Sequence, residues 1–318
     1  MLKFIKQENK ISFSEDNYWG EVSKERMEKY LDNIKNEGFS VFREKLFRED
    51  RGFYDFIFDE IRADWRFCLL SKKDWKVLDI GAGLGANTFV LAKEVKEATA
   101  MERAELRVKF LEARKSYEQA DNVKIISGDA LNLPFEDNSF DLVVANGVFE
   151  WVGVTEKFKT PREAQEFFLK EVLRILKKGG YLYIGIENRF AANFFFGGLD
   201  HSGYRLTSWV PRFLADIYCK IRKGEKYKTY TYSKRGYEKI LNNCGFQDTE
   251  SYLVLPGYNF PKYIIPYENI NGLKFIASRI LGGESFQRKL LKKIIGFPLV
   301  ARLWRFMFFS FAIFVQKK

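Results

Sequence analysis

The chain has 318 residues, enough for one large domain with additions or for two domains. Its three cysteines stand singly, at Cys68, Cys219 and Cys244, which favours neither a disulfide framework nor a zinc site, and we predict no metal. The net charge is +11, and residues 270–318 carry most of it, with six lysines and four arginines against one glutamate. The first ten residues lack a long apolar core, which excludes a secretory signal there and predicts a cytoplasmic protein.

Residues 1–70 are predicted to be mainly helical. Lys24 to Asn36 and Gly52 to Leu69 give the clearest helical patterns. We expect these residues to form an N-terminal cap beside the site described next. Tyr18-Trp19 precede the first helix and are candidates to close over a ligand, although a plain packing role fits them equally well.

A glycine-rich loop follows the first predicted strand. Trp75 to Ile80 is an apolar run typical of a buried parallel strand, and a helix is predicted over residues 86–95. Between them, Gly81-Ala82-Gly83-Leu84-Gly85 forms a turn where the backbone can approach a ligand closely. The spacing is G-x-G-x-G, not the G-x-G-x-x-G of dinucleotide enzymes, and the acidic Asp79 precedes it. The loop predicts a ligand site without specifying the ligand.

Acidic residues follow the next two predicted strands. Residues 98–101 form a short apolar segment that ends at Glu102, 17 residues beyond Gly85. A carboxylate there can accept hydrogen bonds from both hydroxyls of a ribose. A third strand, residues 123–126, leads to Asp129, which can accept the amino hydrogens of an adenine. The two carboxylates therefore predict an adenosine-type ligand.

Two more strands complete the predicted sheet. Residues 140–145 lead to Asn146-Gly147, and residues 181–186 follow the turn at 177–180. Five strands that alternate with helices, each ending in a polar residue or a glycine, predict an α/β fold with a Rossmann-like, doubly wound sheet. The ligand is expected along the carboxyl edge of that sheet.

With these motifs in this order, the chain resembles class I S-adenosylmethionine (SAM)-dependent methyltransferases over about residues 70–190. The matching pieces are Val77 to Gly85, Glu102, Gly128-Asp129-Ala130, the block from Leu133 to Val143, and the turn at 176–180. The resemblance implies a methyltransferase domain over residues 71–268 with SAM as its cofactor. A NAD-binding sheet, or a sheet that has lost its ligand, is the alternative interpretation.

The resemblance also implies which residues contact SAM. It places the loop before the first helix around the methionine part, Glu102 on the ribose, Asp129 with Ala130 on the adenine, and Asn146 with Gly147 near the sulfonium. The cofactor-binding residues implied are Asp79, Gly81, Ala82, Gly83, Gly85, Glu102, Arg103, Asp129, Ala130, Asn146 and Gly147.

An insertion over residues 188–230 separates the fifth strand from a predicted helix at 233–244 and a strand at 249–255. It is expected to lie over the carboxyl edge and to select the substrate. It contains the only histidine, His201, our first choice for a catalytic base because its ordinary pKa suits proton transfer near neutral pH. Asp200 or Glu150 could orient His201 or act instead of it, and proximity of the reactants alone could suffice.

The alternatives to a base are structural. His201 could be a structural or substrate-binding residue, and Glu150 could cap a neighbouring loop. Arg189 and Arg205 are candidates to bind a phosphate or carboxylate of the acceptor, or to form surface ion pairs.

Two observations predict the methyl acceptor: a motif that this sequence lacks, and a less specific resemblance of three short segments. Asn146 to Phe149 stands where methyltransferases of exocyclic amines tend to have Asn-Pro-Pro or Asp-Pro-Pro, which favours a small molecule, lipid or sugar. The segments Tyr18-Trp19, Phe149 to Trp151 and Asp200 to Gly203 look most like enzymes of surface-polysaccharide or glycolipid assembly. We therefore predict O-methylation of a sugar or a lipid-linked saccharide at a membrane surface.

Residues 269–318 are predicted to be a basic, aromatic, helical tail. Phe286 to Ile295 has apolar residues on one half of a helical wheel and cations on the other, which suits the surface of an anionic bilayer. Phe306 to Val315 would be about 15 Å long as a helix, against roughly 30 Å of hydrocarbon, so a shallow anchor on the inner face of the cell membrane is predicted. A helix packed on the protein is the alternative.

Two other functions stay open at this point. An RNA methyltransferase would use the tail to contact phosphates, although the absent amine motif makes nucleic acid the less favoured partner. A non-catalytic SAM-binding protein would bind the cofactor without turnover. The sequence does not identify the methyl acceptor or the oligomeric state.

Overall fold

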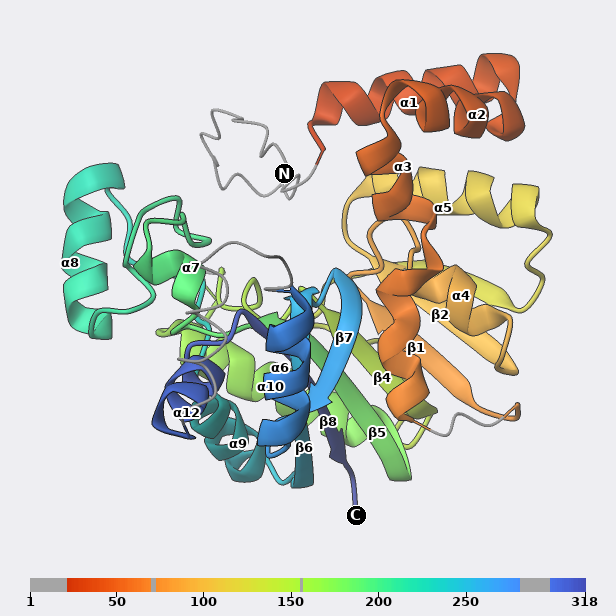
Figure 1. Ribbon diagram of the computed structural model, residues 1–318. Helices are drawn as coiled ribbons and strands as arrows, with labels where there is room; N and C mark the ends of the chain where they lie inside the picture. Colours follow the sequence, from red (N-terminus) through yellow and green to blue (C-terminus); the bar gives the residue numbers. More distant parts are fainter. Residues whose placement is uncertain (1–21, 70–72, 155–156, 281–297) are drawn as a thin grey trace.

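The computed structural model describes residues 22–69, 73–154, 157–280 and 298–318 (Figure 1). A mixed eight-stranded sheet, in the order β3-β2-β1-β4-β5-β8-β6-β7, forms its centre. The strands are β1 (Lys76–Ile80), β2 (Glu97–Glu102), β3 (Val123–Ser127), β4 (Phe140–Asn146), β5 (Leu176–Glu187), β6 (Gln247–Gly257), β7 (Phe260–Pro266) and β8 (Ser310–Gln316). Strands β1 to β5 are parallel, and β8 is antiparallel to both of its neighbours, β5 and β6. The predicted α/β Rossmann-like sheet is confirmed.

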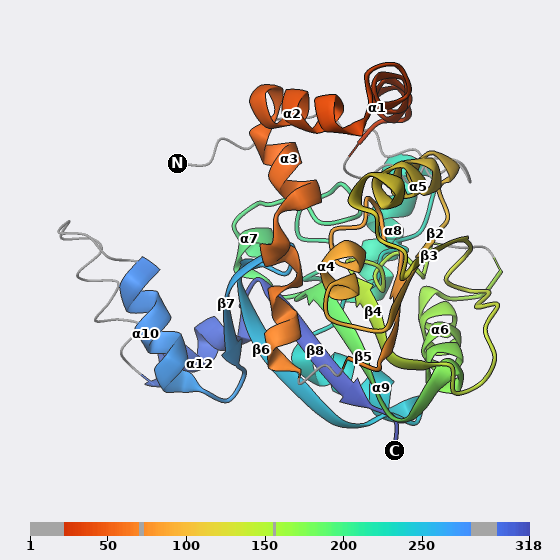
Figure 2. The ribbon, with the colours of Figure 1, turned by 90° about the vertical axis from the view of Figure 1, so that its right-hand side faces the viewer.

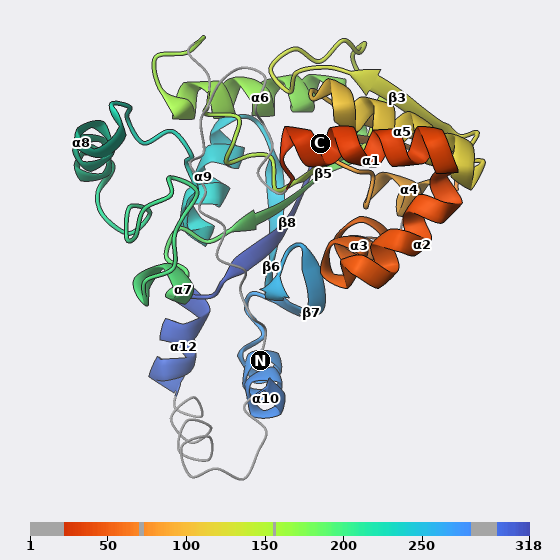
Figure 3. The same cartoon turned by 90° about the horizontal axis from the view of Figure 1, so that it is seen from above.

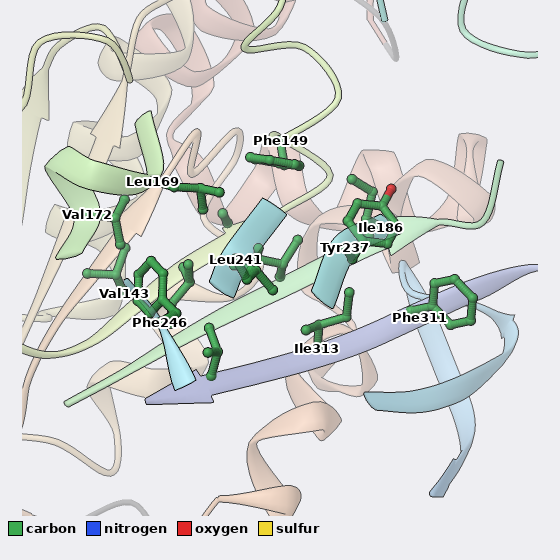
Figure 4. Packing of buried hydrophobic residues seen from close by; sticks show 14 of the residues in the cluster. Val143, Phe149, Leu169, Val172, Ile186, Tyr237, Leu241, Phe246, Phe311 and Ile313 are labelled. Atoms are coloured by element: carbon green, nitrogen blue, oxygen red, sulfur yellow. The ribbon is translucent and has the colours of Figure 1, made fainter. Parts of the chain in front are cut away.

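Helices cover both faces of this sheet. They are α1 (Lys24–Glu37), α2 (Phe39–Glu49), α3 (Arg51–Phe58), the 3₁₀ helix η1 (Glu60–Cys68), α4 (Thr88–Ala92), α5 (Glu105–Glu118), α6 (Pro161–Ile175), α7 (Ala192–Phe195), α8 (Arg212–Lys223), α9 (Lys234–Asn243), α10 (Ile270–Ile280) and α12 (Pro298–Phe306). Figure 2 shows η1 and α6 on opposite sides of the strands. The larger core lies between the sheet and the helices α6 and α9, where Phe149, Leu169 and Tyr237 pack against the strands (Figure 4).

The apolar runs explain the parallel strands. Every residue of β4 between Leu142 and Ala145 is buried, as expected for a strand covered on both faces. The helix α6 begins where Thr160 caps the backbone N–H of Glu163 and Pro161 occupies the first turn. The local sequence and the burial of side chains thus both account for β4 and for the start of α6.

The N-terminal helices are confirmed, and they form a small core of their own. Met27, Phe42 and Ile57 are buried there and pack with Phe110 of α5. Arg62, from η1, reaches further and donates hydrogen bonds to the Phe56 carbonyl and to the Asn259 side chain. The N-terminal region therefore contacts both the helix α5 and the loop between β6 and β7. Tyr18-Trp19 lie outside the described residues.

The C-terminal end differs from the expectation of a helical tail. Pro298–Phe306 is a helix, but Ser310–Gln316 is the strand β8, paired along its length with β5 and with β6. Its side chains from Phe311 to Val315 are all buried, because both faces of the sheet are covered at this point. A short apolar run does not by itself distinguish a buried strand from an interfacial helix. The predicted amphipathic segment at 286–295 lies outside the described residues.

No helix among the described residues is long and apolar enough to cross a membrane.

Candidate functional site

A cavity of about 590 Å³ opens along the carboxyl ends of the parallel strands. Its volume falls in the range of roughly 300–1,000 Å³ that is typical of small-molecule sites. Most of its wall comes from the loops after β1, β2, β3 and β4, and a smaller part comes from the end of β5 and the insertion that follows it. Below, these are called the strand-loop wall and the insertion wall.

The glycine loop forms the bottom of the strand-loop wall. Gly81 and Gly83 have positive φ angles of 64° and 59°, which residues other than glycine rarely adopt. A Cβ atom on Gly81 would lie 2.6 Å from Val148. Gly81, Ala82 and Gly83 line the cavity, whereas a Cβ on Gly85 would meet Phe89 at 2.6 Å, so Gly85 serves close packing of the loop.

Asp79 supports this loop from beneath. It is almost fully buried and accepts a hydrogen bond of 2.6 Å from the Thr88 hydroxyl. Burial raises the pKa of Asp79 to about 7. Asp79 does not line the cavity, so a direct contact with SAM stays a prediction for this residue.

Glu102 lies at the end of β2 and lines the cavity. One of its carboxylate oxygens accepts hydrogen bonds from the backbone N–H groups of Arg103 and Ala104, at 2.9 and 3.0 Å. The other accepts the N–H of Gly83 at 2.9 Å. These bonds fix the carboxylate at the rim and tie the loop after β2 to the glycine loop, and they leave one lone pair of the second oxygen to accept a ligand hydroxyl.

The loop after β3 carries the second acidic group. Asp129 accepts the backbone N–H of Leu131 through one oxygen, and its other oxygen lies 3.8 Å from the Arg103 guanidinium and 3.9 Å from the Lys157 ammonium. Arg103, Asp129 and Ala130 all line the cavity. The residues predicted to bind the ribose and the adenine, Glu102 and Asp129 with Ala130, therefore lie in one wall of the cavity.

Asn146 ends β4 and faces the cavity with an unsatisfied donor. Its buried Nδ2 has no hydrogen-bond partner among the described residues, while the Tyr183 hydroxyl donates to Oδ1 at 3.3 Å. Gly147 has a φ of 70°, and a Cβ there would lie 2.9 Å from the Tyr258 hydroxyl. A buried amide donor without a partner is costly unless a ligand or water satisfies it. The donors and carboxylates of this wall therefore fit an adenosyl ligand.

The insertion wall contains His201. Its ion-pair partner, Glu187, was not predicted from the sequence. His201 Nε2 lies 3.0 Å from Glu187 Oε2, at the end of β5, and 3.9 Å from Glu150 Oε1. We describe this contact as an ion pair, because the two atoms do not meet the geometry of a hydrogen bond. His201 also packs edge-on against Trp151, with 5.0 Å between ring centroids. Glu187 ends a predicted strand at the carboxyl edge, which is the signal that could have identified it.

Asp200 does not orient His201. Its carboxylate accepts hydrogen bonds from the Thr207 hydroxyl at 2.6 Å and from the Ser202 backbone at 2.8 Å, and thereby shapes its own turn. Glu150 is fully buried and does not line the cavity, although it lies beside His201. Glu150 is thus near enough to influence His201, and the catalytic roles of both residues stay predictions.

Charge sets the protonation of this cluster. Burial alone lowers the pKa of His201, but the carboxylates of Glu187 and Glu150 overcome this effect and raise it to about 9. Burial raises the pKa of Glu187, and the imidazolium of His201 reverses this, so that the net shift is downward. At neutral pH, the pair is therefore an imidazolium and a carboxylate.

Glu150, Glu187 and His201 are the residue types that hold cations, and their ligand atoms lie within 4.8 Å of one another. His201 would have to lose its proton before it could ligate a metal, because its imidazolium is paired with Glu187. We assign no metal to the cluster.

The two candidate arginines of the insertion lie outside the cavity wall. Arg189 is half-buried and donates to the carbonyls of Ser208 and Val210, at 2.7 and 2.8 Å. Arg205 is exposed. Arg62, which comes from the N-terminal region, does line the cavity, together with Tyr258 and Asn259 after β6.

The part of this chain that is similar to known proteins includes the residues of the strand-loop wall. A family model described as a methyltransferase domain fits residues 78–184. A demethylmenaquinone methyltransferase of Staphylococcus aureus is 36% identical over 110 residues, which are 34% of this chain and 42% of that relative. The match therefore spans less than half of the relative's length.

Solved structures of methyltransferases show only a weak similarity to this chain. A putative methyltransferase from Bacillus halodurans is 16% identical with a TM-score of 0.44, over 80% of this chain and 98% of that one. A phosphoethanolamine N-methyltransferase 2 from Haemonchus contortus is 17% identical with a TM-score of 0.48, over 91% and 60%. Similarities this low say nothing about a substrate.

The motif order, the sheet and the family match lead to one conclusion. The chain carries a class I methyltransferase domain of the type that uses SAM as its methyl donor.

Proposed function

We propose that this protein transfers a methyl group from SAM to an oxygen of a small-molecule acceptor. A sugar or a lipid-linked saccharide at the inner face of the cell membrane is the acceptor class that its sequence favours. The matched methyltransferase domain supports the first part of the proposal. The insertion wall supports the choice of an oxygen acceptor, because it carries ionisable groups that can take a proton.

The observation that carries the proposal is the placement of His201. It lines the same cavity as Glu102 and Asn146, so an acceptor lying between them has a proton-accepting group on its far side. A hydroxyl must lose its proton during methylation, and a positioned base typically contributes about 10² to 10⁴ in rate.

Each wall has its own task in this reaction. The glycine loop holds the methionine part of SAM, and Glu102 and Asp129 hold its adenosine part. Asn146 offers its amide donor beside the reacting centre. When bound, SAM supplies a methyl group on a positively charged sulfur, so that the carbon–sulfur bond breaks as the bond to the acceptor oxygen forms. Much of the acceleration comes from holding the acceptor in line with that methyl group.

His201 takes the hydroxyl proton when its ring is neutral, and Glu187 then stabilises the imidazolium that results. Because the pKa of His201 is about 9, the neutral fraction rises tenfold per pH unit below that value. The proposal therefore includes a rate that increases from neutral pH toward pH 9.

Radiolabelled methyl transfer from SAM into fractionated lipid, glycan and RNA pools tests this function. We expect label in a glycan or glycolipid fraction with the wild type and at least a hundredfold less with His201→Asn. Label in bulk RNA, with a steep loss in salt, would make the protein an RNA methyltransferase instead. Tight SAM binding by calorimetry without transfer to any pool would make it a non-catalytic SAM-binding protein.

A further inference from the structure

The helix α8 projects from the rest of the molecule (Figures 1 and 3), and it has an apolar face that is exposed to solvent. Five large apolar side chains on this helix are exposed: Phe213, Leu214, Ile217, Tyr218 and Ile221. Ile221 is the most exposed of them, at 78%. An apolar patch of this kind on a folded protein usually marks a surface that meets something else.

These side chains share one side of the helix. At 3.6 residues per turn they cover about 140° of its circumference. The opposite side carries Ala215 and Cys219, which are buried against Tyr227. The backbone N–H of Tyr227 donates to Asp216, and the Arg212 guanidinium donates to the Thr231 carbonyl. The helix is thus attached by its small residues and presents its large ones outward.

Cations border the apolar face on both sides. On the helical wheel, Lys220 lies next to Phe213 at one edge, and Arg222 lies next to Tyr218 at the other. The Arg222 guanidinium carbon is 5.7 Å from the centroid of the Tyr218 ring. Residues 212–228 hold six lysines or arginines against two acidic residues. Long cationic side chains beside an apolar face can extend to anionic headgroups while the face enters the acyl region.

We propose that α8 lies flat on an anionic phospholipid bilayer. Charge complementarity selects this occupant, because a second copy of the chain docked through the same face would oppose its own cations. The surface is distinct from the C-terminal segment 286–295, for which the sequence alone predicted membrane contact.

The position of α8 relates the bilayer to the cavity. Phe195 and Phe196 at the end of α7 and Leu199 beyond it are exposed, and Leu199 also lines the cavity. Figures 1 and 3 place α7 and α8 on the same side of the molecule. If the proposed methylation of a membrane-proximal acceptor holds, this side is where a lipid-borne acceptor enters, and this last step alone rests on the proposed function.

Co-sedimentation of the full chain with vesicles tests the proposal. We expect binding to mixed phosphatidylcholine and phosphatidylglycerol vesicles, and weaker binding to phosphatidylcholine alone. Ile217→Asp with Ile221→Asp should lower the partition to mixed vesicles at least tenfold, because two apolar side chains that enter the bilayer are replaced by anions. Lys220→Gln with Arg222→Gln should lower it roughly tenfold, and only on anionic vesicles.

Val41→Asp is the matched control, since Val41 is also an exposed β-branched residue on a helix, in α2. It should leave vesicle binding unchanged. SAM binding by calorimetry, without vesicles, should be the same in all variants, which separates this surface from the methyl-transfer proposal. Unchanged partition of the α8 variants would overturn the inference. So would a wild type that ignores vesicles but forms a dimer that the isoleucine variants dissociate.

Discussion

The two walls of the cavity differ in how their chemistry is encoded. The strand-loop wall is built from residues at or shortly after the ends of strands, so its glycines, Glu102 and Asp129 can be located from the strands themselves. The insertion wall depends on a contact between His201 and Glu187 that only the fold creates. The first wall belongs to the segment shared with other methyltransferases, and the second lies beyond its end at residue 184. Cofactor binding is thus local in the sequence, whereas acceptor chemistry is assembled in three dimensions.

The largest expected effect separates the two walls by function. His201→Asn should lower kcat by about 10² to 10⁴ because it removes the base while it keeps a polar side chain of similar shape. SAM affinity, measured by calorimetry, should change less than about twofold, since His201 lies on the insertion wall. A parallel loss of SAM affinity would mean that His201 holds the cofactor and that the division between the walls is wrong.

The next effect addresses the strand-loop wall. Glu102→Gln should weaken SAM binding roughly 10- to 100-fold, because charge-assisted hydrogen bonds to ribose hydroxyls are replaced by weaker ones. Calorimetric titration with SAM measures this loss. Asp121→Asn, at an exposed position between α5 and β3, is the matched control and should bind SAM as the wild type does. Equal affinities for Glu102→Gln and the wild type would exclude Glu102 from ribose binding.

The pH dependence sharpens the view of the insertion wall. The pKa of His201 is raised to about 9 because anionic carboxylates stabilise its charged form. Glu187→Gln removes one of them, so the pKa of His201 should fall and the rise in kcat/KM should move to lower pH. A pH–rate profile from pH 6 to about 10 in the wild type and in Glu187→Gln measures the shift. A profile that the substitution leaves in place would assign the proton transfer to another group.

The sequence predicted most of the sheet because its strands are encoded locally. Trp75 to Ile80 and residues 140–145 are apolar runs that end in glycine or polar residues, and they became β1 and β4. β8 was misinterpreted because its burial comes from β5 and β6, which lie far away in the chain. Arg62 was missed for a related reason, since a residue of an N-terminal helix reaches the cavity through the partner Asn259.

The smallest expected effect tests the one cation that the sequence offered for acceptor binding and the structure leaves exposed. Arg205 does not line the cavity, although it forms a single antiparallel bridge with Leu199, which does. Arg205→Ala should therefore change kcat and KM for the acceptor less than about twofold, as expected for an exposed charge. Steady-state kinetics with the acceptor fraction that takes up label would measure both constants. A tenfold rise in KM at constant kcat would show that a bound acceptor extends past Leu199 to this guanidinium, and the insertion wall would then be larger than the cavity that encloses His201.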